Sequence, residues 1–236
     1  AIGAQVFANN IVVKSIILPE SIKEIGASAF LNSILDKITL NEGLATIGES
    51  AFEGTEIADI KLPNSLEQIG NRAFFGCRKL EIDLNLNEGV TTIGEEAFSK
   101  SNIKSITLPN TVKTLGKKAF LGCTNLTNVS LNEGLTTIGE EGTFSQTKIQ
   151  SITIPSSVTK IEKSAFLNCS ALENVVLNEG LTSIGQAAFA KSAINTITIP
   201  STVTKIEKSA FALCKKLTSI KSKVKQADIK WVWAEL

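Results

Sequence analysis

The stretch LPNTVKTLGKKAFLGCTNLTNVSL, from Leu108 to Leu131, decides the fold of this 236-residue chain, because its pattern recurs along the sequence. Its landmark is Phe120, and an equivalent Phe returns every 22 to 24 residues. The ten equivalent residues are Phe7, Phe30, Phe52, Phe74, Phe98, Phe120, Phe144, Phe166, Phe189 and Phe211. A fixed period of this length is typical of repeat architectures. The sequence therefore predicts about ten coils.

Each repeat contains a short segment in which apolar and polar residues alternate. The segments SITLP at 105–109 and NVSLN at 128–132 are examples, and such alternation predicts a strand with one buried face. A single coil cannot bury its own apolar residues, so neighbouring coils must stack, with parallel strands about 4.8 Å apart. We expect an α/β repeat solenoid that has a parallel β-sheet on one face and irregular or short 3₁₀ arms on the other.

Two kinds of coil alternate along the chain. In one kind the strand ends at a Pro, which has no N–H to donate to a ladder; in the other an Asn-Glu-Gly turn takes this place. These residues are Pro19, Pro63, Pro109, Pro155 and Pro200, and Asn41, Asn87, Asn132 and Asn178. The repeating unit is therefore a pair of coils. We predict one solenoid domain over residues 1–220 and a C-terminal cap over 221–236, which contains Trp231 and Trp233.

The composition excludes several classes of function. Lys and Arg number 24 against 23 Asp and Glu, so the net charge is +1 and no excess of positive charge would attract nucleic acid. No apolar run approaches the roughly 20 residues that a membrane span needs. The chain contains no His, the commonest general base and metal ligand. We therefore expect no enzyme activity, no cofactor, no metal site and no membrane span.

Four cysteines, Cys77, Cys123, Cys169 and Cys214, occur once per pair of coils. Residues two coils apart in a stack have Cα atoms about 10 Å apart, beyond the limit of roughly 7 Å for a disulfide. Small residues such as Thr55 and Ser101 occupy the same place in the intervening coils. The spacing predicts four buried free thiols.

The run from Leu108 to Leu131 resembles the leucine-rich repeat of the BspA-like, or Treponema pallidum, type, whose pattern is roughly LPxxLxxIGxxAFxxCxxLxxIxL. The resemblance covers residues 2 to 220. It implies a cell-surface or secreted protein, because proteins of this family are mostly bacterial or protist surface proteins and some are adhesins for host matrix proteins such as fibronectin and fibrinogen. The chain departs from the pattern where Glu162 and Glu207 replace Gly and where one residue is added at Gly142-Thr143.

Two surfaces are candidates for contact with a partner. The outward strand positions, among them Thr107, Ser130 and Thr153, form a face without aromatic residues. The residue after the repeated Phe is apolar in alternate coils and would form an interrupted stripe, of which Phe75 is the largest member; the stripe consists of Leu31, Phe75, Leu121 and Leu167. The alternative is that these side chains only pack between coils. The predicted function is protein binding by a surface adhesin, and the alternative is a structural spacer or self-association module.

Overall fold

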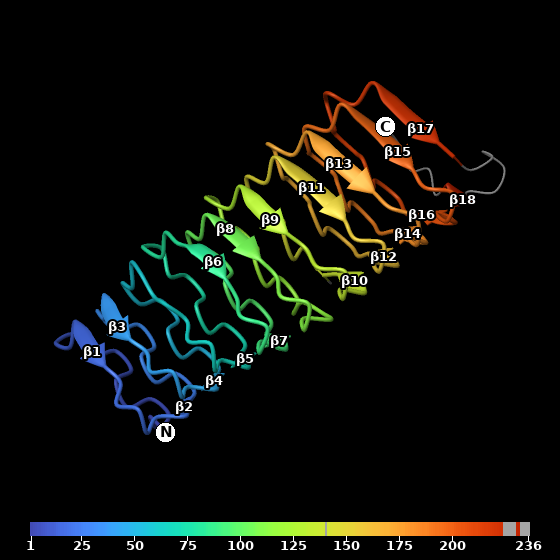
Figure 1. Cartoon of the computed structure of the whole chain (residues 1–236). Coiled ribbons are helices and arrows are strands. Elements are labelled where there is room, and N and C mark those ends of the chain that lie inside the picture. Colours follow the sequence, from blue (N-terminus) through green and yellow to red (C-terminus); the bar gives the residue numbers. More distant parts are fainter. Residues whose placement is uncertain (140, 224–229, 232–236) are drawn as a thin grey trace.

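The coils stack in chain order along one axis (Figure 1). The structure is a computed structural model that describes residues 1–139, 141–223 and 230–231. It is a parallel β-solenoid of about nine turns, where the number of repeated Phe residues had predicted about ten. No residue within these ranges forms an α-helix or a 3₁₀ helix. The predicted α/β class and the 3₁₀ arms are therefore wrong.

The longer strands, of three or four residues, lie on one side of the solenoid and form the predicted parallel sheet (Figure 1). They are β1 (Ser15–Ile17), β3 (Lys37–Thr39), β6 (Asp83–Asn85), β8 (Ser105–Thr107), β9 (Asn128–Ser130), β11 (Ser151–Ile154), β13 (Asn174–Leu177), β15 (Thr196–Ile199) and β17 (Ser219–Ser222). Equivalent residues pair, so that Ile106 lies opposite Val129 and Thr107 opposite Ser130. The sheet is broken into the groups β1-β3, β6-β8-β9, β11-β13 and β15-β17.

A second parallel ladder, which the sequence analysis missed, runs through the arms. Its two-residue strands are β2 (Glu24–Ile25), β4 (Thr46–Ile47), β5 (Gln68–Ile69), β7 (Thr92–Ile93), β10 (Thr137–Ile138), β12 (Lys160–Ile161), β14 (Ser183–Ile184), β16 (Lys205–Ile206) and β18 (Lys230–Trp231). From β2 to β16 the second residue is the β-branched Ile, which favours extended backbone. In the coil between β7 and β10, Leu115 takes this place and the ladder is interrupted. The arms therefore contain one short strand in most coils, between turns.

The C-terminal segment adds one strand to this second ladder. Trp231 of β18 pairs in parallel with Ile206 of β16. Lys221 and Ser222, which the sequence analysis assigned to the cap, belong to β17 and pair with β15. Trp233 lies outside the described residues. That 221–236 caps the last coil therefore remains a proposal.

Left-handed backbone at two places in each coil explains why the arms do not become helical. The residue two places before the repeated Phe and the residue two places after it both have positive φ, as in Arg72 (54°) and Gly76 (68°) around Phe74. A single left-handed residue ends a right-handed helical turn. Most of these positions hold polar residues rather than Gly, so sequence reasoning based on Gly did not find them.

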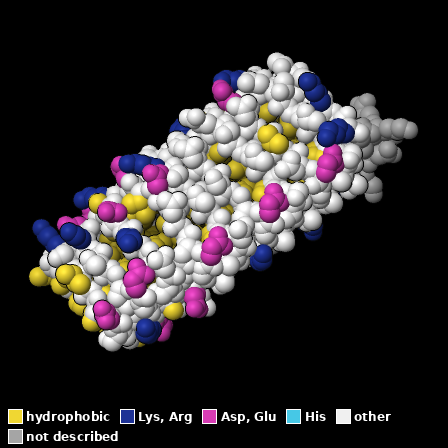
Figure 2. Space-filling model, viewed as in Figure 1, with side chains coloured by type: hydrophobic (Ala, Val, Ile, Leu, Met, Phe, Trp, Pro, Cys, Tyr) yellow, Lys and Arg dark blue, Asp and Glu magenta, His cyan; other side chains and the backbone are white. Residues whose placement is uncertain are grey.

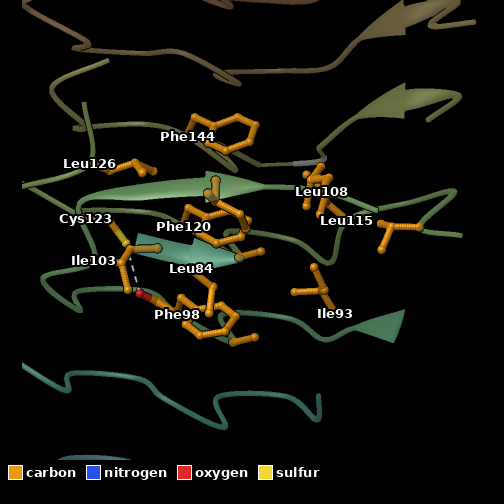
Figure 3. Close-up of a cluster of buried hydrophobic side chains, with 14 of the residues drawn as sticks. Leu84, Ile93, Phe98, Ile103, Leu108, Leu115, Phe120, Cys123, Leu126 and Phe144 are labelled. Atoms are coloured by element: carbon orange, nitrogen blue, oxygen red, sulfur yellow. Dashed lines mark hydrogen bonds between the residues drawn. The ribbon is translucent and has the colours of Figure 1, made fainter. Parts of the chain in front are cut away.

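The ten repeated Phe rings form one continuous stack, part of which is shown in Figure 3. Adjacent ring centroids are 5.1 to 5.6 Å apart and the ring planes are within 15° of parallel. The backbone N–H of Phe98 donates to the carbonyl of Ala119 in the next coil at 2.8 Å. The same hydrogen bond joins Phe52 to Ala73 and Phe166 to Ala188. Ala before Phe is fully buried in these coils and leaves room for the stack.

Side-chain hydrogen bonds from the Asn-Glu-Gly turn join the two kinds of coil. Asn132 Nδ2 donates to the carbonyls of Pro109 (2.7 Å) and Val112 (3.1 Å) in the preceding coil. The Glu133 carboxylate accepts from the backbone N–H of Ser156 in the following coil at 3.1 Å. Equivalent Asn bonds form at Asn41 and Asn87, and equivalent Glu bonds form at Glu42, Glu88 and Glu179. The Asn-Glu-Gly turn therefore bonds to the Pro-ended coils on both sides.

The four cysteines are free and buried, as predicted. Cys123 Sγ donates to the carbonyl of Phe98 in the preceding coil at 3.0 Å (Figure 3), and the Ser101 hydroxyl donates to the same oxygen at 2.7 Å. Burial raises the pKa of the Cys77 and Cys123 thiols to about 12 and that of Cys169 to about 11. These thiols are therefore uncharged, structural hydrogen-bond donors at neutral pH.

Replacing one ring of the stack should destabilise the whole fold. Phe120 is fully buried between Phe98 and Phe144. Phe120→Ala leaves a cavity that its neighbours cannot fill, so we expect a loss of about 3 to 5 kcal/mol of unfolding free energy in a denaturant titration. A loss below about 1 kcal/mol would show that the ring stack does not carry the core.

The thiols should be inaccessible to reagents while the chain is folded. Because a thiolate is the reactive species, the raised pKa values and burial both suppress the reaction. Titration with a disulfide reagent near pH 8 should find few reactive thiols in the native protein and four after denaturation. A native disulfide between any two of them would contradict the coil register.

Candidate functional site

The most distinctive departure from the repeat is a hollow of about 540 Å³ beside Phe75, which we call the Phe75 hollow. It lies where the turns after Phe52 and Phe74 face each other. Its lining consists of Asn32, Glu53, Gly54, Thr55, Glu56, Phe75, Gly76, Arg78, Lys79 and Lys100. Phe75 is half-buried and is the one Phe of eleven that lies outside the ring stack.

Two glycines open this hollow. Gly54 and Gly76 both occupy the left-handed position two places after the repeated Phe, at φ 68°. Asn32, Lys100 and Gln146 occupy the same position in other coils, with φ between 52° and 62°. A Cβ added to Gly76 would meet nothing within 4 Å. A Cβ added to Gly54 would lie 2.5 Å from Asn32 Oδ1, so the hollow is open mainly at Gly76, where the coil lacks a side chain that other coils carry.

Arg72 holds Phe75 in place. Its guanidinium carbon lies 3.7 Å from the centroid of the Phe75 ring, and Lys100 Nζ lies 5.1 Å from that centroid. Arg72 Nη2 pairs with Glu53 Oε1 at 2.5 Å, and Nη1 pairs with Glu96 in the next coil. One Arg thus bridges three coils while its flat face covers an aromatic ring, an arrangement that suits guanidinium better than ammonium.

The pKa values of this cluster follow from its contacts. Burial by itself would raise the pKa of Glu53, but hydrogen bonds from Arg72 and Ser50 and the charge of Arg72 outweigh it, so the pKa lies below its ordinary value. The pKa of Arg72 is raised, first by its hydrogen bond with Glu53 and further by Glu96. Both groups are therefore charged at neutral pH.

The remaining cations of the Phe75 hollow are exposed. Lys79 pairs with Glu56 at 2.6 Å, whereas Arg78 and Lys100 make no ion pair with any residue that the structure describes. Glu56 and Lys79 also line a second depression, of about 820 Å³, on the sheet face. That depression lies where Asp59 makes only an isolated bridge to Lys37 between β3 and β6. The two depressions therefore share the Glu56–Lys79 pair in their linings.

The structure separates the two sets of predicted contact residues. Thr107, Ser130 and Thr153 are exposed on β8, β9 and β11, in neighbouring coils of the sheet face, and do not line the Phe75 hollow. The residues of the apolar stripe are each half-buried and lie two coils apart; they are Leu31, Phe75, Leu121 and Leu167. The buried Ser99 separates Phe75 from Leu121, and the buried Ser145 separates Leu121 from Leu167. Only Phe75 of this stripe lines the hollow. These residues therefore do not form one continuous site.

Sequence reasoning missed the polar part of the hollow. Arg72 and Arg78 are the two Arg residues of the chain, and they flank the single additional Phe within seven positions. Gly54 and Gly76 occupy the same position, two places after the repeated Phe, in two successive coils, and neither has a side chain. These two irregularities were visible in the sequence and could have located the site.

Neither a metal centre nor a membrane helix is found in the part of the chain that the structure describes. No three His, Cys, Asp or Glu side chains there lie together in a way that could hold an ion. The described residues also include no helix of the length and hydrophobicity that crossing a bilayer requires.

Comparison with known proteins identifies the repeat. The BspA-type leucine-rich repeat region matches the chain in six copies, over residues 1–110, 45–142 and 140–230. No curated protein matches the chain. A leucine-rich repeat protein from Bacteroides ovatus has a similar structure, with a TM-score of 0.71 and 31% sequence identity over 92% of this chain.

Two further solved structures are similar. Pneumococcal vaccine antigen PcpA has a TM-score of 0.60 and 28% identity over 89% of this chain. A leucine-rich cell surface protein from Faecalibacterium prausnitzii has a TM-score of 0.56 over 96% of this chain at 24% identity, a likeness of fold alone. The chain covers 51%, 62% and 64% of the Bacteroides, pneumococcal and Faecalibacterium structures, respectively.

The Arg72 cluster should stabilise the fold in a pH-dependent way. Lys118 has the same left-handed backbone as Arg72, with φ 54° in both, so Arg72→Lys tests the guanidinium without straining the backbone. We expect a loss of about 1 kcal/mol at pH 7, since the Arg72 side chain is 35% exposed. The lowered pKa of Glu53 means that its contribution is complete above about pH 4.5 and is lost as pH falls further.

Denaturant titrations at pH 7 and pH 3 would measure this. The difference in unfolding free energy between the wild type and Arg72→Lys should shrink at the lower pH. A difference that is equally large at both values would contradict a role for the charged carboxylate.

Proposed function

The chain belongs to the BspA-type leucine-rich repeat family, and from this premise we propose that it is the protein-binding region of a cell-surface or secreted adhesin. The similar structures support a surface location, because one is called a cell surface protein and another a vaccine antigen. The partner class that the family resemblance implies is a host or extracellular-matrix protein. Similar solved structures are leucine-rich repeat proteins, a fold generally without catalytic activity, and this supports binding rather than catalysis.

The Phe75 hollow is the observation that carries the proposal. Elsewhere the sheet face presents mainly Thr, Ser, Asn and Lys, together with the exposed Ile17 and Val176, and it has no aromatic or Arg side chain of the kind that dominates most interfaces. At the hollow, Phe75 and Arg78 line a concave surface and Arg72 stacks on the Phe75 ring beside it, and aromatic and Arg side chains supply most binding hot spots. We assign the central contact to Phe75.

The other predicted contacts have a supporting role in this proposal. Thr107, Ser130 and Thr153 offer exposed polar groups on the sheet. Leu31, Leu121 and Leu167 each keep part of an apolar side chain exposed. Such contacts add area around a hot spot and contribute little individually.

One observation favours a second candidate, self-association of the solenoid. Val6, Ile11, Val12 and Ile17 of the first coil are 57%, 77%, 76% and 79% exposed. Figure 2 shows apolar side chains at this N-terminal end, whereas charged residues of both signs are interspersed along the solenoid. Exposed apolar patches often mark protein contacts. Association through these side chains would make sedimentation coefficients rise with protein concentration.

A side chain placed in the hollow should block partner binding without unfolding the chain. Gly76→Asn adds a residue that tolerates the left-handed backbone, as Asn32 shows at the same position. Gly122→Asn is the matched control, because Gly122 has φ 70° and does not line the hollow. We expect Gly76→Asn to weaken binding to immobilised fibronectin at least tenfold and Gly122→Asn to leave it unchanged. Melting temperatures should stay within a few degrees in both variants.

Phe75→Ser provides an independent test of the same surface. It should weaken binding and change the melting temperature little if Phe75 contacts the partner. A large fall in melting temperature with undiminished binding would assign Phe75 to packing between coils. Absence of wild-type binding to fibronectin, fibrinogen and other matrix proteins would refute the matrix-adhesion proposal.

A further inference from the structure

A second hollow lies at the equivalent place near the other end of the solenoid. It has a volume of about 410 Å³ and is lined by Ser170, Lys191, Ser192, Ala193, Leu213, Lys215 and Lys216. The lining turns follow Phe189 and Phe211, as those of the Phe75 hollow follow Phe52 and Phe74. The turn after Phe211 leads into β17, and the turn after Phe74 leads into β6 (Figure 1). We call this depression the Leu213 hollow.

The two hollows share basic residues at the two positions after Cys. Lys215 and Lys216 follow Cys214 as Arg78 and Lys79 follow Cys77, and the other two Cys residues are followed by uncharged residues. Lys191 and Lys100 each lie two places after a repeated Phe, with φ of 61° and 58°. In the other coils this left-handed position holds mainly Asn and Gly. Basic side chains therefore gather at these two turns.

Each hollow combines exposed positive charge with one apolar side chain. In the Leu213 hollow, Leu213 is 64% exposed, and Lys216 pairs with Glu173 at 2.6 Å. Lys191 and Lys215 are exposed and make no ion pair with any described residue. The Phe75 hollow contains the same kinds of group in Phe75, Arg78 and Lys100, of which only Arg78 stands at the repeat position of its counterpart, Lys215. A ligand that complements both sites carries a carboxylate beside an apolar side chain.

The spacing of the hollows follows from the ring stack. Six coil steps separate Phe74 from Phe211, and each step measures 5.1 to 5.6 Å between ring centroids. With about 4.8 Å of rise per coil, the hollows lie about 30 Å apart along the axis. Both are formed by the same turn of the coil, so they face the same side of the solenoid.

We propose that the Phe75 hollow and the Leu213 hollow are a pair of binding sites for acidic protein segments that carry an apolar side chain, and that one partner occupies both at once. Mixed charge favours a peptide over a uniform polyanion, because Glu53, Glu56 and Glu96 lie in or beside the Phe75 hollow and would repel dense negative charge. The proposal rests on the protein-binding function. It adds a second binding site, an acidic ligand and a fixed distance between the two hollows.

Synthetic probes test the proposal without knowledge of the natural partner. The monovalent probe is the labelled peptide Ac-Glu-Asp-Phe-Asp-Glu-amide, and fluorescence anisotropy measures its binding to the full chain. Two copies joined by a flexible Gly-Ser linker of about 30 residues can span both hollows, because the root-mean-square length of such a linker is about 30 Å. Two copies joined directly, the short divalent probe, cannot, since their Phe residues are then five positions apart and extend to at most about 18 Å. We expect the long divalent probe to bind at least tenfold more tightly than the monovalent one and the short one to show no such gain.

Matched variants locate the effect. Arg78→Glu and Lys215→Glu should each abolish the gain of the long divalent probe, because one site is lost. Lys163→Glu makes the same change at an exposed lysine outside both hollows and should preserve the gain. Circular dichroism and melting temperature confirm that each variant is folded.

Three results would overturn the proposal. The first is no binding of the acidic probe, or equal binding of a probe with Gln and Asn in place of Glu and Asp. The second is equal affinity of the long divalent and monovalent probes. The third is a divalent gain that survives Lys215→Glu. None of these outcomes bears on fibronectin binding that depends on Gly76, so failure of this proposal is distinguishable from failure of the adhesin proposal.

Discussion

The rest of the structure depends on the stack of Phe rings and the hydrogen bond that accompanies it. In most coils the Phe N–H donates to the carbonyl of the Ala that precedes the next Phe, so ring stacking and backbone pairing are satisfied by the same coil-to-coil translation. A coil with a different rise along the axis would break both the ring stacking and the backbone hydrogen bond. The two parallel ladders, the Cys hydrogen bonds and the Asn bonds all lie at this fixed spacing. Each coil is thus stabilised by its neighbours rather than by itself.

Positions outside this constraint can vary, and the candidate sites lie there. The residue two places after the repeated Phe has a left-handed backbone but a side chain that faces outward, so Gly, Asn, Lys and Leu all occupy it. Gly54 and Gly76 create one hollow, and Lys191 and Leu213 shape the other. The repeat therefore provides a regular scaffold on which variable surface residues recur at fixed intervals.

The sequence predicted the coil period, the longer strands and the buried thiols, because each follows from an apolar or small residue that recurs in every coil or pair of coils. It did not predict the second ladder, since two-residue strands such as β5 leave too short a pattern, or the left-handed residues, since Ser28 and Arg72 share no distinctive side chain. It singled out Phe75 but not Arg72, Arg78 or Lys100. Their convergence depends on which turns face each other in three dimensions, and this follows only once the coils are stacked.

Native-state hydrogen exchange tests the central claim most directly, because it reports on each Phe N–H separately. If coil-to-coil pairing through the ring stack holds the fold, the amide protons of Phe52, Phe74, Phe98 and Phe166 should exchange slowest and with similar free energies of opening. The proton of Phe7, in the first coil, should exchange faster, because only one neighbour supports it. Exchange of the central Phe protons as fast as that of exposed turn residues would contradict the account.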